Sequence, residues 1–133
     1  MATARWIETN RTKWLGTRPA YDGERVRGYY EKSDGGATVY TVASNKVLLL
    51  TNYVLIVSNT GANNLYGYAY IRNSADDFIH LLGFFKPLAD HVEEIANNFN
   101  PPYEMIEGDY IELSAESANV NTYISIYGVL LDE

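Results

Sequence analysis

Residues 46–58 read Lys-Val-Leu-Leu-Leu-Thr-Asn-Tyr-Val-Leu-Ile-Val-Ser and contain the longest apolar stretch of the chain. In an extended strand successive side chains point to opposite faces, and here both sets of alternate positions are largely apolar. A strand of this kind is covered on both faces, or it bends from one sheet to another. The polar pair Thr51-Asn52 interrupts the stretch, which is too short to cross a membrane as a helix. These residues therefore predict a long central strand of a β-protein.

Shorter alternating segments, separated by turn signals, precede and follow this strand. We expect further strands at residues 25–32, 37–42, 65–72, 78–85, 103–106, 110–114 and 119–131. The first two flank Ser33-Asp34-Gly35-Gly36, and we expect them to form a hairpin because glycine supplies the positive φ of a tight turn. About eight strands with turns at roughly 8–12-residue spacing are typical of a β-sandwich or barrel.

One stretch departs from the strand pattern. Its apolar residues Leu88, Val92, Ile95 and Phe99 recur with helical spacing, which predicts a short helix from residue 88 to residue 96. The following Asn100-Pro101-Pro102 is expected to break the chain's regular structure, because proline lacks the backbone N–H that helices and strands use.

Charge is divided unevenly along the chain, with the boundary near residue 28. Residues 1–28 carry six basic and three acidic side chains (6 − 3 = +3), and residues 29–133 carry four and fourteen (4 − 14 = −10), which together give the net charge of −7. The apolar residues near the N-terminal end, including Trp6 and Trp14, follow neither a helical nor a strand period. We therefore expect an extended basic N-terminal arm over residues 1–22 and a β-sandwich domain over residues 23–133.

Two alternatives remain open for the arm. It is a frayed tail, as many chain termini are, or it lies ordered on a neighbouring molecule or on the flank of its own domain. The tryptophans favour the second alternative, because a Trp side chain left in water exposes a large apolar surface. The candidate partner-binding residues of the arm are Trp6, Arg11, Lys13, Trp14 and Arg18.

Composition argues against several classes of function. The chain has no cysteine, which excludes disulfides, thiolate zinc sites and cysteine nucleophiles. Residues 1–11 lack the apolar region of a secretory signal, so we expect a soluble product made without one. The net charge of −7 disfavours nucleic acid as a partner of the body, since like charges repel the phosphate backbone. Neither nucleic acid nor a membrane is an expected partner.

The sequence carries no catalytic or metal-binding motif. Its two histidines, His80 and His91, are eleven residues apart (91 − 80 = 11) and form no His-x-His pair. A serine in a Gly-x-Ser-x-Gly turn and a phosphate-binding loop are both missing. Paired carboxylates that are distant in the chain leave a small hydrolase open as an alternative. We expect a protein that is not an enzyme and that needs no metal or cofactor.

Tyrosine is the most distinctive part of the composition, with 12 residues. Within the strand expected at residues 65–72, Tyr66, Tyr68 and Tyr70 share one face, and small Gly67 and Ala69 lie on the other. Tyr rings on one sheet face can stack on sugar rings, which would make the chain a carbohydrate-binding module. They can equally pack against the second sheet or a subunit neighbour. We favour packing, because the face with the small residues would make the poorer core.

Four pieces of sequence carry a resemblance to a known group of proteins. They are Arg27-Gly28-Tyr29-Tyr30, the strand-turn-strand tract of residues 40–52, the tract of residues 99–113 with its Pro-Pro and Glu-Gly-Asp turn, and the closing Ile126-Tyr127-Gly128. Residues 28–133 thus resemble the small jelly-roll proteins of tailed-bacteriophage particles. The resemblance implies a virion component, either a capsid decoration (cement) protein or a piece of the neck or tail, usually arranged as symmetric trimers or rings.

We therefore expect an all-β fold, a jelly-roll-like antiparallel β-sandwich of about eight strands with an extended N-terminal arm. The expected function is that of a structural virion protein on the capsid surface or at the neck or tail. It would decorate the shell by binding a major capsid protein or another virion protein, through the symmetric contacts of a homotrimer or ring and through the arm. A glycan-binding module that recognises a host surface is the main alternative. The expected core includes Val42, Leu48, Leu50, Ile71, Ile111, Leu113, Ile124 and Ile126.

Overall fold

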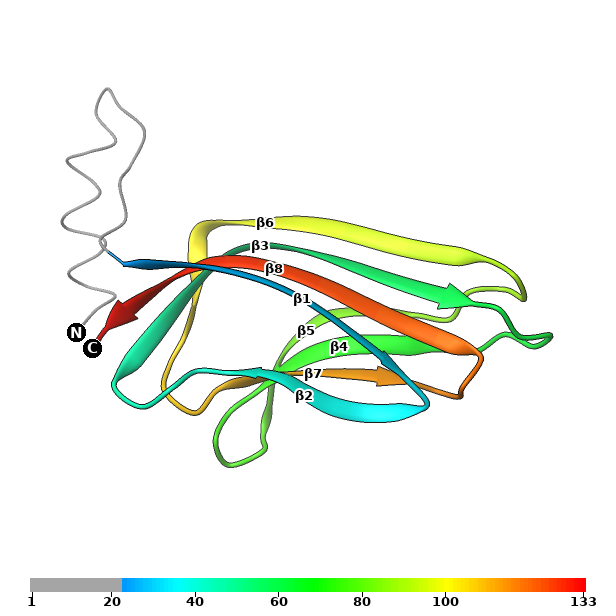
Figure 1. Cartoon of the computed structure of the whole chain (residues 1–133), viewed down its shortest axis with the longest axis horizontal. Coiled ribbons are helices and arrows are strands. Elements are labelled where there is room, and N and C mark those ends of the chain that lie inside the picture. Colours follow the sequence, from blue (N-terminus) through cyan, green and yellow to red (C-terminus); the bar gives the residue numbers. More distant parts are fainter. Residues whose placement is uncertain (1–22) are drawn as a thin grey trace, which may run out of the picture.

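The computed structural model describes residues 23–133, which form eight strands and no helix (Figure 1). No helix within this part of the chain could therefore span a membrane. The strands are β1 (Glu24–Ser33), β2 (Gly35–Thr41), β3 (Lys46–Asn59), β4 (Gly67–Arg72), β5 (Phe78–Phe85), β6 (Val92–Met105), β7 (Tyr110–Ala115) and β8 (Val120–Asp132).

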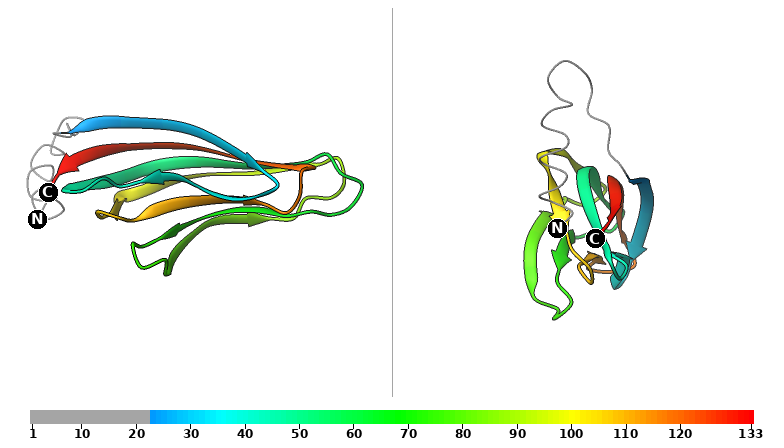
Figure 2. Two further views of the ribbon diagram at one scale, coloured as in Figure 1. Left: turned by 60° about the horizontal axis from the view of Figure 1, so that its bottom comes forward. Right: turned by 90° about the vertical axis from the view of Figure 1, so that its left-hand side faces the viewer.

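The strands form two four-stranded antiparallel sheets that face each other as two layers (Figure 2). The first sheet has the order β1-β8-β3-β6 and the second has the order β2-β7-β4-β5. The chain passes from one sheet to the other at each connection except that between β4 and β5, which pair directly. This strand order is that of a jelly roll, in which two Greek keys close over a shared core. The expected all-β jelly-roll-like sandwich is confirmed.

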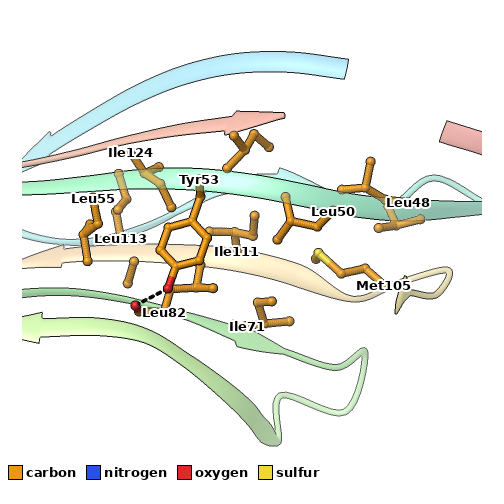
Figure 3. Close-up of a cluster of buried hydrophobic side chains, with 13 residues drawn as sticks. Leu48, Leu50, Tyr53, Leu55, Ile71, Leu82, Met105, Ile111, Leu113 and Ile124 are labelled. Carbon is orange, nitrogen blue, oxygen red and sulfur yellow. Dashed lines mark hydrogen bonds between the residues drawn. The ribbon is translucent and has the colours of Figure 1, made fainter. Parts of the chain in front are cut away.

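Strand β3 lies in the middle of the first sheet, between β8 and β6, as its sequence predicts. Its register shifts between Leu50 and Asn52, so Leu48 and Leu50 before the shift and Tyr53 after it all enter the core. The buried Tyr53 hydroxyl donates a hydrogen bond to the Leu82 carbonyl at 2.6 Å, which satisfies its polar group across the two sheets (Figure 3). All eight expected core residues are buried in the same cluster.

The other face of β3 explains why its first half is apolar at every position. Val47 and Leu49 are buried with Val129 and Leu131 of β8 in a second, smaller cluster that is separate from the main core. Leu48 and Leu50, which alternate with them, belong to the core between the sheets. Both faces of this end of β3 are therefore buried.

The expected hairpin at residues 33–36 is wrong. Asp34 and Gly35 do have the positive φ values of a tight turn, 51° and 105°. The strands on either side do not pair with each other, however, because β1 pairs with β8 and β2 pairs with β7. The turn instead carries the chain from the first sheet to the second.

The expected helix at residues 88–96 is also wrong. Residues from Val92 onward form the first half of β6, an edge strand in which Ile95 pairs with Leu55 of β3. The Pro101-Pro102 pair does not end this strand. It lies between Asn98 and Tyr103, where the β3–β6 register shifts, and proline is tolerated at such irregularities of an edge strand because the ladder of hydrogen bonds is interrupted there. Pairing with β3 outweighs the local helical spacing.

Candidate interaction surface

The two faces of β4 differ in the size of their side chains. Ala69 and Ile71 are fully buried between the sheets, and Gly67 lies on the same inner face. A Cβ atom on Gly67 would lie only 2.2 Å from Thr122 Oγ1 and 2.9 Å from a methyl carbon of Val57, so the first sheet leaves no room there for a side chain. The tyrosines consequently point away from the core. Of the two kinds of packing expected for them, packing against the opposite sheet of the sandwich is wrong, and packing against a subunit neighbour remains a prediction.

Five aromatic side chains gather on this outer face of the second sheet. We call them the aromatic array: Tyr66, Tyr68 and Tyr70 from β4 and the residue before it, and Phe78 and Phe84 from β5. Their ring centroids are 5.9 Å apart for Tyr66–Tyr68, 5.2 Å for Tyr68–Tyr70, 5.5 Å for Tyr66–Phe84, 5.9 Å for Tyr68–Phe84 and 5.6 Å for Tyr70–Phe78.

Most of the rings in the array lie nearly parallel. The planes of Tyr68 and Tyr70 differ by 13°, and those of Phe84 with Tyr66 and Tyr68 by 23° and 21°. Near-parallel rings at these separations overlap with an offset, which is a favoured arrangement of aromatic pairs. Tyr66, Tyr68, Tyr70 and Phe84 therefore stack on one another, and the two phenylalanines are the most exposed members of the array.

The exposed apolar part of the array is supplied by β5. Phe78 is 57% exposed and Phe84 is 51% exposed, and Leu81, which pairs with Tyr70, is 47% exposed. Apolar side chains that are contiguous and exposed mark contact sites more often than single exposed residues do. Phe78 and Phe84 were not among the predicted site residues, because only the register of β5 against β4 places them beside the tyrosines.

A polar cluster fixes one end of the array. The Tyr70 hydroxyl donates a hydrogen bond to Glu112 of β7 and accepts one from Arg72 Nη2 at 2.8 Å. The Arg72 guanidinium lies 4.7 Å from the centroid of the Tyr70 ring, and its Nη1 donates to the Asp76 carbonyl at 2.6 Å. Burial and the hydrogen bond to Glu112 raise the pKa of Tyr70 to about 12. The hydroxyl is therefore uncharged at neutral pH and positions the ring.

The outer face of the first sheet carries a second, smaller aromatic group, which the sequence analysis also missed. Tyr29 of β1 is 63% exposed and stacks with Tyr123 of β8 at 6.2 Å. The Arg27 guanidinium lies 5.6 Å from the centre of the Tyr127 ring, a distance at which a cation is attracted to an aromatic face.

The histidines and acidic side chains of residues 23–133 form no group of three or more that could hold a metal ion. His80 packs between the sheets, with its ring 5.1 Å from that of Tyr103 and 5.9 Å from that of Phe99. His91 is exposed, and its Nδ1 lies 2.7 Å from the Ala89 carbonyl oxygen. The two histidines therefore have separate surroundings.

The predicted partner-binding residues fall into two groups. Tyr66, Tyr68 and Tyr70 come together in the aromatic array. The arm residues lie outside the described part of the chain, so their role remains a prediction; they are Trp6, Arg11, Lys13, Trp14 and Arg18.

Comparison with known proteins yields similarities of structure alone. No protein-family model matches the chain, and no curated protein matches its sequence. Among solved structures, the Drosophila NLP core, described for pentamer formation and histone binding, is 15% identical, with a TM-score of 0.44 and coverage of 80% of this chain and 98% of the other. A pentameric capsid protein from metagenomic phage sequences is 10% identical, with a TM-score of 0.44 and coverage of 92% and 71%.

A carbohydrate-binding protein is similar to the same degree. It is the C-terminal family 22 carbohydrate-binding module of Clostridium thermocellum Xyn10B, which is 17% identical, with a TM-score of 0.42 and coverage of 84% of this chain and 77% of the other. Similar structures thus include both capsid and carbohydrate-binding proteins, and their assembly and ligands are properties of those proteins.

Proposed function

We propose that this chain is a non-enzymatic structural protein that assembles through the outer face of its second sheet. The aromatic array carries the proposal. Its rings are fixed by stacking and by the Arg72–Tyr70–Glu112 cluster, yet Phe78 and Phe84 stay more than half exposed. A rigid, partly exposed aromatic surface gains most when a protein partner covers it, because aromatic residues are enriched in the buried centres of interfaces.

The assembly in which this surface would serve is a virus particle of the tailed-phage type. The chain would decorate the capsid shell as a symmetric homo-oligomer, with a trimer as the expected state, or serve as a piece of the neck or tail. Three features support this proposal: the jelly-roll strand order, the exposed array and the sequence resemblance of residues 28–133. Residues 1–22, with Trp6 and Trp14 among basic side chains, would attach the domain to a major capsid protein or another virion protein.

The test of this proposal is particle binding. Purified full-length chain should co-sediment with capsid shells that lack it, at a saturating ratio set by the shell's symmetry. A variant with Phe78→Ser and Phe84→Ser should still fold but should bind the shells less tightly, because it removes the exposed part of the array. Ile106→Ser is a matched control, since Ile106 is 52% exposed but lies in the loop between β6 and β7. Unchanged binding by the array variant would refute the role of this surface.

Glycan binding is the second candidate function for the array. The exposure of Phe78 and Phe84 favours it, since an exposed ring can stack on a sugar. The mutual overlap of the tyrosines disfavours it, because stacking on a sugar ring requires a free aromatic face. A glycan array probed with the full chain distinguishes the two functions. If the chain is a monomer that binds a glycan at micromolar concentration, and if Phe84→Ser abolishes this binding, glycan recognition would replace the structural role as the proposed function.

A further inference from the structure

The two edge strands of the first sheet carry opposite charge. Residues 23–133 have six basic and fifteen acidic side chains (6 − 15 = −9), and β1 holds half of those bases, Arg25, Arg27 and Lys32, against two acids. Strand β6, at the other edge, holds Glu93, Glu94 and Glu104 and no lysine or arginine. In a strongly acidic domain, the basic groups are thus concentrated at one edge and the opposite edge is purely acidic.

Within residues 23–133, no further strand pairs with either edge. Of the strands in this part of the chain, β6 pairs only with β3, and residues 92–98 are exposed without interruption, including Val92 at 59% and Ile95 at 38%. Among the same strands, β1 pairs only with β8 and exposes Tyr29. An edge strand has backbone N–H and C=O groups that its own sheet does not use, and a long open edge is a template for another strand.

The direction of the strands decides which edges can meet. Every pair in the first sheet is antiparallel, so with four strands in the order β1-β8-β3-β6 the two edge strands run in opposite directions. A second copy placed beside the first in the same orientation therefore brings its β1 antiparallel to β6, and the sheet pattern continues. Joining two β6 edges would instead bring three carboxylates against three more, which like-charge repulsion disfavours.

The register across the sheet shows which residues would lie level with each other. Through their partners on β8 and β3, Arg25 is level with Glu104, and Lys32 is level with Glu93. If β1 of one copy lies beside β6 of the next with no offset along the strand direction, these residues therefore form two pairs of opposite charge.

One like-charged pair accompanies them. Glu31 is level with Glu94 in the same register, so the two favourable pairs outnumber a single unfavourable one. Strand β5 lies at the same edge of the sandwich as β6, because the two strands are near each other. A neighbour at this edge would thus also cover part of β5.

We propose that copies of this chain associate head to tail, with β1 of one copy beside β6 of the next, and close into a ring. This inference rests on the proposed self-assembly and adds an edge contact to the contact proposed for the aromatic array. Because the two surfaces in contact differ, the interface is heterologous, and such interfaces form rings when the rotation closes. A two-fold dimer, in which the same surface meets itself, does not use this contact.

Charge reversal tests the contact directly. Arg25→Glu with Lys32→Glu reverses the β1 edge, and Glu93→Lys with Glu104→Lys reverses the β6 edge. Each double variant should weaken association of the full chain by about tenfold or more, measured by sedimentation velocity over a concentration series. The quadruple variant, in which both edges are reversed, should recover association, since the Arg25–Glu104 and Lys32–Glu93 positions again pair opposite charges. Circular dichroism checks that each variant keeps its β-sheet signal.

Cysteine cross-linking provides a second measurement that needs no charge reversal. Because the chain has no cysteine, Lys32→Cys with Glu93→Cys introduces the only two thiols. Oxidation should give a ladder of covalent oligomers that ends at the ring size, and neither single-cysteine variant should cross-link. Efficient dimers from Glu93→Cys alone would overturn the proposal, because like edges would then meet. Charge-reversal double variants that associate as well as the unmodified chain would also overturn the proposed edge contact, although self-assembly itself would stand. A monomeric unmodified chain would instead remove the proposed function.

Discussion

The two faces of β4 have opposite compositions, and the larger side chains are on the outside. The inner face presents Gly67 and Ala69 to the first sheet, whereas the outer face carries the tyrosines of the aromatic array, of which Tyr70 is itself only 7% exposed. The inner face is small because Thr122 and Val57 already occupy the space in front of Gly67. A strand that places its large aromatic residues outside leaves apolar area for another molecule to bury. The inner face therefore contributes to stability, and the outer face is the surface that we propose for association.

Shortening a core side chain should have the largest effect on stability. Leu50 is fully buried between the sheets, so Leu50→Ala removes apolar contacts and leaves a cavity. We expect the free energy of unfolding to fall by about 2–4 kcal/mol, as measured by urea denaturation. A loss below about 1 kcal/mol, well under that range, would show that the core is not packed as described.

Enlarging the inner face of β4 should also destabilise the domain. Gly67→Ala places a methyl group against the side chains of Thr122 and Val57, so these side chains or their strands must shift, at a cost of about 1–3 kcal/mol. Gly36→Ala is the matched control, because the nearest atom to a Cβ there is 3.6 Å away. Equal melting temperatures for the two variants would contradict the close approach of the sheets at Gly67.

Removing the Tyr70 hydroxyl should have a smaller effect that depends on pH. Tyr70→Phe leaves Glu112 and Arg72 without their shared partner and should cost about 1–2 kcal/mol at neutral pH. The folded pKa of Tyr70, about 12, exceeds the usual value near 10, so the folded state binds this proton more tightly than the unfolded state. The unmodified protein should therefore lose stability as pH rises from about 10 to about 12, and the variant should lose less. If the free energy of unfolding fell equally with pH in the unmodified protein and in Tyr70→Phe, the result would contradict the role of the Tyr70–Glu112–Arg72 cluster.

Deleting the arm should affect stability least. A chain that starts at Gly23 should keep its β-sheet signal and most of its melting temperature but lose assembly or particle binding. Unfolding of this shortened chain would place part of the core within residues 1–22. Normal assembly and attachment would show that the arm is a frayed tail.

The contrast between strands explains how much of the fold could be predicted. Strand β3 was recognisable because both of its faces are buried, which leaves a continuous apolar run. Strand β6 was not, because residues 92–98 are exposed on both faces and so carry no alternation. The turn at Asp34-Gly35 was visible from its residue types, but these do not specify which strands pair.

The candidate surface was predictable only in part, for a similar reason. Alternation placed Tyr66, Tyr68 and Tyr70 on one face, but it does not state which face is buried. The phenylalanines of β5 join them through a register that contains two shifts, between Ala69 and Tyr70 and between Ile71 and Arg72. Contacts that depend on such irregularities are set by tertiary packing and are not readable from periodicity.

The most direct measurement of the central claim is the mass of the assembled protein with and without the exposed part of the array. Sedimentation equilibrium of the full chain at micromolar concentration should give a mass that is a multiple of 15.0 kDa. The variant with Phe78→Ser and Phe84→Ser should shift toward the single-chain mass while it keeps its β-sheet signal, and Ile106→Ser should not. A single 15.0 kDa species for the unmodified chain, or full assembly of the array variant, would contradict the account.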